Sequence, residues 1–191
     1  MNLIATGIAD LVVLETRVHA DPRGYFMETF SERAFAAAGL PTRFAQDNFS
    51  RSTRGILRGL HFQNPNPQGK LVRCTLGRVW DVAVDIRPDS PTFGRHHGVE
   101  LSDENHLAMY VPEGFAHGFY VLSDVAHFVY KCTSAYSPAD DAGVLWNDPA
   151  LAIAWPLVGD PVLSDKDRRH GTLAEVHAAG RLAPAGRPTP R

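Results

Sequence analysis

The run VWDVAVDIR constrains the fold most, because its residues alternate with the two-residue period of a β-strand. One face carries large apolar side chains and the other mixes small apolar residues with carboxylates: the first set is Trp80, Val82, Val84 and Ile86, and the second is Val79, Asp81, Ala83 and Asp85. The run LVRCTL comes just before it, separated by Gly77 and Arg78. A two-residue connection that contains glycine predicts a tight β-hairpin here.

Four more runs have strand composition, and short turn sequences separate them. The runs are GRHHGVEL, LAMYVP, HGFYVL and VAHFVYKCT, and the turns are PDSP, SDEN, PEG and LSD. Many short strands at near-regular spacing favour an all-β sandwich or barrel over an α/β fold. We therefore predict a double-sheet jelly roll, a cupin-like β-barrel with a few short helices and a pocket inside the roll. The stretch SERAFAAAGL predicts one such helix, with Ser31 as its N-cap and Gly39 at its end.

The chain length of 191 residues suits one large domain. We expect a single jelly-roll domain over residues 1–170. Residues 171–191 form a C-terminal segment whose Pro/Gly/Arg-rich end predicts a mobile tail. Cys74 and Cys132 lie far apart without a metal-binding spacing, which favours reduced, buried thiols.

Charge and hydropathy exclude several classes of partner. With 19 basic and 21 acidic residues the net charge is -2, so the chain offers no general surface for nucleic acid or for an anionic membrane. A local basic pocket for a phosphorylated small molecule is compatible with this balance. No apolar run approaches the roughly 20 residues of a membrane span, and the N-terminus lacks the pattern of a signal peptide. We expect a cytoplasmic protein.

The metal-binding motif in this chain is incomplete. The segment PEGFAHGF contains P-x-G-x-x-H, which is the pattern of the second metal-binding motif of the cupins. A cupin metal site also needs an upstream H-x-H with a glutamate, and this chain has no H-x-H. His96 and His97 are adjacent, so on a strand they point to opposite faces and cannot chelate one ion together. We expect a metal-free pocket in which His117 has another role.

Two residues are candidates for proton transfer, His61 in RGLHFQ and Tyr130 in FVYKCT. Desolvation would keep the His61 imidazole neutral at about pH 7, so that it could accept a proton. A base of this kind needs a carboxylate to orient it. Pattern alone does not identify that carboxylate, and it favours a simple core histidine and a packed core tyrosine. Several cations also fit ordinary solvated surface charges by pattern: Lys70, Arg23, Arg58 and Lys166.

Eleven short blocks follow one another in an order that is far more specific than any one of them. They are DPRGYFMETF, QDNFSRS, GILRGLHFQ, QGKLVR, WDVAVDIR, SPTFG, LSDENH, VPEGFAHGF, VYKCT, WNDP and LSDKD. From about Asp21 to Asp167 the chain thereby resembles the dTDP-4-dehydrorhamnose 3,5-epimerase family. The resemblance implies a metal-free, cupin-type jelly roll that needs no cofactor and forms a homodimer with exchanged strands. It also implies a dTDP-4-keto-6-deoxyhexose as the substrate.

The resemblance implies an epimerisation in which only protons move. Carbons 3 and 5 of the sugar flank the ketone, so removal of either proton gives an enolate, and reprotonation on the opposite ring face inverts the centre. By matching motifs, the resemblance implies that His61 is the base and that Asp167 is its orienting carboxylate. Tyr130 matches the proton donor, and Lys70 matches a group near the sugar oxygens, where we expect it to stabilise the enolate.

The same matching implies a set of substrate contacts, whose cations suit a diphosphate. The set is Arg23, Glu28, Gln46, Asp47, Asn48, Arg58, His117, Asp141 and Lys166. Two positions depart from the family pattern. Phe49 stands where a histidine is common, and Asp141 is one methylene shorter than the usual glutamate. These departures affect the contacts expected at the nucleoside end and leave the catalytic set intact.

Three other functions compete with this interpretation. An epimerase that inverts only carbon 5 or only carbon 3 of a related dTDP-4-keto-deoxysugar would use the same histidine, aspartate and tyrosine. A non-catalytic sugar-binding cupin would not need all three together. A metal-dependent cupin oxygenase would need bound iron, manganese or nickel.

The segment RGLHFQ contains a conflict between pattern and resemblance. Strict strand alternation sets Arg58 with Leu60 and Phe62, on the face opposite His61. The resemblance nevertheless sends Arg58 and His61 to the same substrate. Both hold if Gly59 marks a bulge or twist, or if Arg58 serves the pocket of the dimer mate. We therefore expect a backbone irregularity at Gly59.

Overall fold

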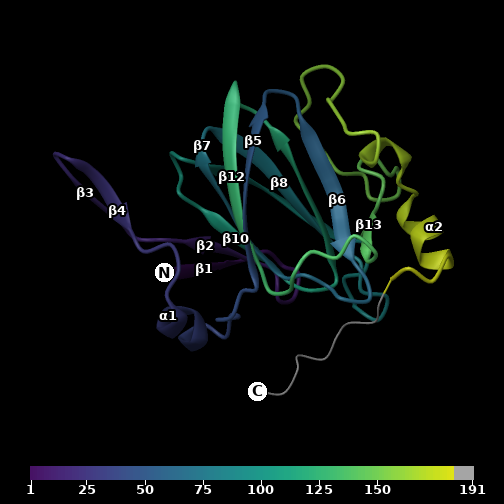
Figure 1. The fold of residues 1–191 in the computed structure, drawn as a ribbon, viewed down its shortest axis with the longest axis horizontal. Coiled ribbons are helices and arrows are strands. Elements are labelled where there is room, and N and C mark those ends of the chain that lie inside the picture. Colours follow the sequence, from purple (N-terminus) through teal and green to yellow (C-terminus); the bar gives the residue numbers. More distant parts are fainter. Residues whose placement is uncertain (183–191) are drawn as a thin grey trace.

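The computed structural model describes residues 1–182. Most of the residues with regular secondary structure lie in β-strands (Figure 1). The strands are β1 (Asn2–Ala5), β2 (Val12–Glu15), β3 (Val18–Asp21), β4 (Gly24–Met27), β5 (Gln46–Thr53), β6 (Leu57–Gln63), β7 (Lys70–Leu76), β8 (Arg78–Asp85), β9 (His96–Ser102), β10 (Ala108–Val111), β11 (Phe115–Val121), β12 (Val125–Cys132) and β13 (Asp141–Gly143). The helices are α1 (Glu32–Ala37), the 3₁₀ helix η1 (Asp167–Arg169) and α2 (Leu173–Ala178). No helix in residues 1–182 is long and apolar enough to cross a membrane.

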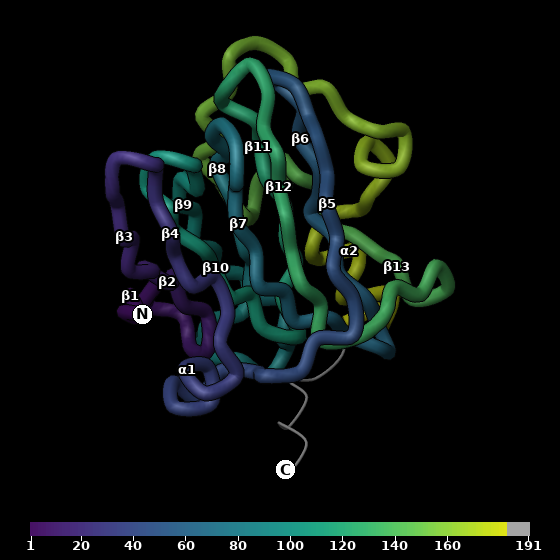
Figure 2. Tube along the Cα trace, turned by 60° about the vertical axis from the view of Figure 1, so that its left-hand side comes forward, coloured from purple at the N-terminus to yellow at the C-terminus, as the bar shows by residue number. Residues whose placement is uncertain are grey.

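Two antiparallel sheets form the body of the molecule. The six-stranded sheet has the order β1-β2-β10-β7-β12-β5, and the five-stranded sheet has the order β13-β6-β11-β8-β9. Strands β3 and β4 form a separate hairpin that projects on the side away from β13 and α2 (Figures 1 and 2). The paired sheets confirm the predicted all-β jelly roll.

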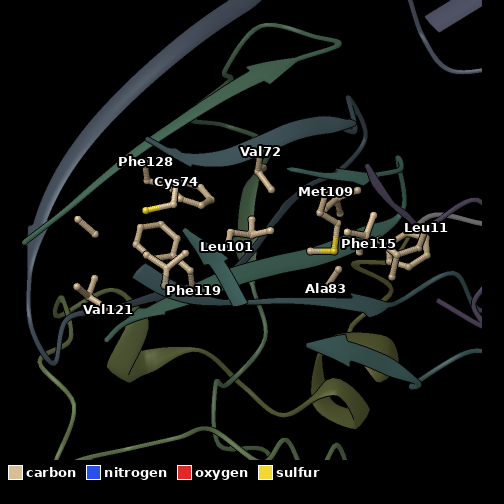
Figure 3. Close-up of a cluster of buried hydrophobic side chains, with 14 of the residues drawn as sticks. Leu11, Val72, Cys74, Ala83, Leu101, Met109, Phe115, Phe119, Val121 and Phe128 are labelled. Carbon is tan, nitrogen blue, oxygen red and sulfur yellow. The ribbon is translucent and has the colours of Figure 1, made fainter. Parts of the chain in front are cut away.

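An apolar core fills much of the space between the two sheets (Figure 3). The rings of Phe119 on β11 and Phe128 on β12 stack with centroids 4.3 Å apart, so the core joins one sheet directly to the other. Each large side chain that is fully buried here contributes about 1.5–3 kcal/mol of hydrophobic stabilisation. Members of the core come from both sheets and include Val72, Cys74, Ala83, Leu101, Met109, Phe115 and Val121.

Helices cover part of the outer face of each sheet. Helix α1 confirms the helix expected at Ser31–Leu40 and buries Phe35 against the six-stranded sheet, although Ser31 precedes it without a side-chain capping bond. Helix α2 packs on the five-stranded sheet through Leu173 and Val176.

Helix α2 lies inside the segment predicted to be a C-terminal extension. The Thr172 hydroxyl accepts a hydrogen bond from the Glu175 backbone N–H, and the Glu175 carboxylate accepts one from the Thr172 N–H, which is a capping box. Leu182 is also buried in the same cluster as α2. The rest of the predicted tail, residues 183–191, lies outside the described residues, and the division of the chain at residue 170 stays a prediction.

The tight hairpin predicted at Gly77 and Arg78 is wrong. Strands β7 and β8 belong to different sheets, so this connection is a corner of the roll. Gly77 has φ +76°, and a Cβ there would collide with Ser123 and with the carbonyl of Val125. A glycine with positive φ between two strands fits a hairpin within one sheet and also a corner between two sheets. The local sequence therefore does not distinguish the two connections.

The irregularity expected at Gly59 is present. Arg58 and His61 are three positions apart on β6, whereas their partners on β11, Phe119 and His117, are two positions apart. The extra residue brings Arg58 and His61 to the same face, toward the interior of the roll. Gly59 has φ +128°, and a Cβ on it would lie 2.6 Å from the Cα of Gly118. The strands can approach so closely at the bulge because both positions, Gly59 and Gly118, lack a Cβ.

We predict that Gly59→Ala destabilises the fold more than Gly24→Ala does. Gly24 has φ +129°, and a Cβ added to it would meet nothing within 4 Å, so it shares the backbone strain without the collision. Overpacking should cost Gly59→Ala about 1–3 kcal/mol beyond that strain. Urea unfolding of both variants measures the difference. Equal losses of unfolding free energy would show that the contact between β6 and β11 is not tight.

Candidate active site

His61 and Asp167 form a hydrogen-bonded pair at the interior edge of the five-stranded sheet. His61 Nε2 lies 2.5 Å from Asp167 Oδ1, and the His61 side chain is 30% exposed while that of Asp167 is 4% exposed. The Asp167 backbone N–H donates to the Ser164 hydroxyl, which holds the start of η1 in place. With Nε2 bonded to the carboxylate, Nδ1 is the ring nitrogen that is left to accept a proton.

Burial and charge set the protonation states of this pair. Burial lowers the pKa of His61, against the opposing hydrogen bond and charge of Asp167, and the charges of Lys70 and Lys166 lower it further. Burial acts to raise the pKa of Asp167, but the imidazoles of His170 and His61 outweigh it and leave this pKa lowered. The favoured state is therefore a neutral imidazole beside a charged carboxylate.

A second histidine–aspartate pair lies beside the first. His117 on β11 is the direct cross-strand partner of His61, so both side chains enter the interior from the same sheet. His117 Nε2 lies 2.9 Å and 3.0 Å from the two carboxylate oxygens of Asp81, which is fully buried. Asp81 was not among the site residues expected from the sequence. Its signal was a carboxylate next to small apolar residues on the mixed face of the strand.

Tyr130 enters the same interior from the opposite, six-stranded sheet. Its neighbour on that face of β12 is Phe128, whose ring stacks against His117 at 6.2 Å between centroids. Since His117 is paired with His61, the chain of contacts places His61 and Tyr130 on facing walls. Burial raises the pKa of the Tyr130 hydroxyl, with a small opposing effect from the Arg58 cation.

Lys70 is buried at the first position of β7, in contrast to the exposed lysine that pattern favours. Burial lowers the pKa of its ammonium group, while Cys132, Asp81 and Asp141 act in the opposite direction. Cys132 is its cross-strand partner on β12, two residues beyond Tyr130 on the same face. The lysine therefore belongs to the polar end of the interior.

Further predicted contact residues lie on the inner faces of both sheets. The Gln46 side-chain amide donates to Asn48 Oδ1 at 2.8 Å, and the Asn48 amide lies 3.6 Å from the Cys132 sulfur. The Arg58 guanidinium donates from Nε to the Ser52 hydroxyl at 3.0 Å, which bridges the two sheets. These contacts put amide and guanidinium donors beside Tyr130.

Asp141 and Lys166 form an ion pair at the rim. Lys166 Nζ lies 2.5 Å from Asp141 Oδ2, and the Tyr136 hydroxyl donates to the same oxygen at 3.0 Å. Asp141 begins β13, which pairs with β6 so that Gly143 stands opposite His61. The shorter carboxylate found here in place of glutamate is thus tied to Lys166, one residue before Asp167.

Four residues that the sequence drew attention to are not brought into this interior by the single chain. Asp47 points to the outer face of the six-stranded sheet, where Lys131 Nζ binds it at 2.6 Å. Phe49 is exposed on that face, and with Asp47 it lines a cavity of about 430 Å³ whose lining also includes Asn48 and Tyr130 but not His61. Arg23 and Glu28 are exposed on and just after the projecting β3–β4 hairpin (Figure 1).

The arrangement is suited to moving protons on opposite sides of a bound molecule. The neutral imidazole of His61, held by Asp167, lies on one wall, and the protonated phenol of Tyr130 lies on the facing wall. The buried amino group of Lys70 belongs to the same sheet as Tyr130. These are a base, an acid and a stabiliser for developing negative charge.

Comparison with known proteins identifies one family. The family model for dTDP-4-dehydrorhamnose 3,5-epimerase matches residues 5–175. A dTDP-4-dehydrorhamnose 3,5-epimerase of Shigella flexneri is 55% identical over 169 residues, covering 87% of this chain and 93% of that protein. A dTDP-4-dehydrorhamnose 3-epimerase of Streptomyces niveus is 44% identical over 184 residues, covering 95% and 88%.

Solved structures give the same result. The dTDP-6-deoxy-D-glucose-3,5-epimerase of Legionella pneumophila, in complex with dTDP-4-keto-L-rhamnose, superposes with a TM-score of 0.92 at 48% identity. The match covers 97% of this chain and 99% of that chain. From the matched sequence and the shared fold, the chain belongs to the dTDP-4-dehydrorhamnose 3,5-epimerase family.

Proposed function

We propose that the chain inverts carbons 3 and 5 of dTDP-4-dehydro-6-deoxy-D-glucose to give dTDP-4-dehydro-L-rhamnose. Family membership supports this reaction, and so does the activity named for the Shigella relative. The single observation that carries it is the placement of the His61–Asp167 pair and Tyr130 on facing walls of one interior. A sugar ring between these walls would meet a base on one face and an acid on the other.

The proposed reaction follows from the acidity of carbons beside a ketone. His61 takes the proton from carbon 3 or carbon 5 at Nδ1, and the electron pair of the broken C–H bond passes to the ketone oxygen as an enolate. Asp167 stabilises the imidazolium that forms. Tyr130 then returns a proton to the opposite face of that carbon, and the enolate electrons form the new C–H bond, which inverts the centre.

Lys70 is proposed to stabilise the enolate oxygen. Its side chain is buried, and within residues 1–182 no carboxylate forms an ion pair with it, because Asp141 at the rim is paired with Lys166. A buried cation without an ion-pair partner is costly to hold. Negative charge that develops on the ketone oxygen would remove part of that cost in the transition state.

We also propose that the enzyme acts as a homodimer in which the β3–β4 hairpin reaches the partner's site. The hairpin carries exposed aromatic side chains, with Tyr25 54% exposed and Phe26 70% exposed. Arg23 at its tip is 90% exposed, and its guanidinium binds only Asp21 among the described residues. Contact with a second copy would bury the aromatic rings and deliver Arg23 and Glu28 to a nucleotide diphosphate.

Epimerisation at a single carbon is the second candidate. The Streptomyces niveus relative, named a 3-epimerase, favours it, because the chain is 44% identical to that protein. Both reactions use the same proton-transfer groups, so the number of carbons that exchange protons distinguishes them.

We predict that turnover in heavy water labels both carbons. The keto sugar should gain deuterium from solvent at carbon 3 and carbon 5, because each inversion passes through an enolate that is reprotonated by an exchangeable group. Proton NMR of the product locates the label, and a reaction without enzyme is the control. Deuterium at one carbon alone would support the single-centre reaction, and its absence from both would exclude the proposed chemistry.

We predict that His61→Ala and Tyr130→Phe each lower kcat by about 10²–10⁴-fold, which is the usual contribution of a positioned acid or base. His127→Ala is the matched control, since His127 packs against Phe49 on the outer face of β12. Circular dichroism checks that all three variants fold. Wild-type turnover in either site variant would remove that residue from the mechanism.

We predict that two inactive variants, Arg23→Ala and His61→Ala, restore activity when coexpressed and purified as a mixed dimer. One of the two sites would then hold an intact His61 together with Arg23 from the other chain, so the mixed dimer should have about half of the wild-type activity. Separate affinity tags allow its isolation. A mixed dimer as inactive as its parents would place Arg23 in the site of its own chain.

A further inference from the structure

His170 is a largely covered histidine that lies beside the His61–Asp167 pair and that the proposed reaction does not use. Its side chain is 12% exposed, and its Nε2 lies 3.6 Å from Asp167 Oδ1, beyond hydrogen-bond distance. The His61 and His170 rings meet edge to face, with centroids 5.8 Å apart. Among the described residues, the buried His170 Nε2 has no hydrogen-bond partner.

The backbone around His170 holds its ring in place. Gly143 of β13 lies opposite His61 of β6, and a Cβ on Gly143 would collide with the His170 ring. The next residue, Gly171, is fixed because its carbonyl accepts a hydrogen bond from the Leu145 N–H at 2.8 Å. The His170 imidazole is therefore packed against Gly143, the cross-strand partner of His61. Its unpartnered Nε2 lies beside the Asp167 carboxylate.

We propose that His61, Asp167 and His170 bind a divalent transition-metal ion such as Zn²⁺, and that this ion inhibits the enzyme. One ligand atom from each residue lies within 4.8 Å of the other two. Two imidazole nitrogens and one carboxylate oxygen are a donor set that Zn²⁺ prefers, with a fourth position left for water. Bond lengths of about 2.0–2.2 Å place tetrahedral ligands roughly 3.3 Å apart, which small side-chain shifts achieve here.

Inhibition follows from the tautomer of His61. In the metal-free pair, Nε2 carries the proton that is donated to Asp167, and Nδ1 is free to act as base. A metal ion on Nε2 replaces that proton, which moves to Nδ1, because a neutral imidazole that ligates through one nitrogen carries its proton on the other. The atom proposed to accept the substrate proton is then already occupied. This inhibitory step rests on the proposed function, whereas metal binding itself does not.

The test measures binding of Zn²⁺ alone by isothermal titration calorimetry, with the visible spectrum of bound Co²⁺ as a second readout. Wild-type protein should bind one ion per chain, and His170→Ala should weaken binding at least about 10-fold. His177→Ala is the matched control, since His177 is an exposed histidine on α2 in the same segment. His170→Gln, which keeps a polar side chain of similar size, replaces the alanine variant if that variant does not fold.

Turnover assays then separate binding from inhibition. Zn²⁺ should inhibit the wild type and His177→Ala at the same concentration, and the midpoint should rise at least about 10-fold in His170→Ala relative to its own zinc-free rate. Equal zinc affinity in wild type and His170→Ala, or no binding to either, would overturn the site. Binding that leaves turnover unchanged would overturn the inhibition. If the proposed reaction is wrong, the difference in zinc affinity between the wild type and His170→Ala persists in the calorimetric titration, although there is no epimerase activity to inhibit.

Discussion

The close contact between β6 and β11 at Gly59 and Gly118 decides which side chains enter the interior of the roll. Without the extra residue in β6, alternation would direct Arg58 toward the outer cluster that contains Leu60 and Phe62. The bulge leaves Leu60 and Phe62 in the outer cluster and turns Arg58 to the inner face, which already carries His61. The close approach of two glycines thus adds a guanidinium group to the interior.

The interior of the roll is divided into an apolar part and a charged part. Stacked rings and aliphatic side chains join the sheets in one region, and buried charges gather beside it. Two of the carboxylates, Asp81 and Asp167, each face a histidine. Burial of a charged carboxylate costs free energy because the group loses its hydration, and a hydrogen bond to a histidine offsets only part of that cost. Their concentration at one place is therefore better explained by catalysis than by folding.

Sequence patterns predicted the fold class and most strands, because period-two alternation reports directly which residues share a face. They did not predict which strands pair, so the corner at Gly77 was interpreted as a hairpin: pairing depends on long-range contacts that a local turn signal does not contain. Helix α2 was missed although Thr172 and Glu175 have capping-box spacing, since the Pro- and Gly-rich composition after them dominated the interpretation.

The partners of His61 could not be found from pattern, because they lie far from it in sequence. Asp167 came from the family resemblance alone, and His170 was not recognised at all. Their proximity depends on packing of the chain after β13 against the edge of β6, where the Leu57 N–H donates to the carbonyl of Val162. No periodicity within either segment encodes that contact. The bulge at Gly59 was inferred only because resemblance and alternation disagreed about Arg58.

The carboxylate that is hydrogen-bonded to His61 does not belong to either sheet of the jelly roll, because Asp167 lies in η1. Asp167 is supplied by a segment that docks after both sheets have been completed in chain order, and α2 anchors that segment. During synthesis, both sheets can therefore close before Asp167 is present to bind His61. The hydrogen bond between His61 and Asp167 can form only after η1 has been added to two sheets whose strands are already complete in chain order.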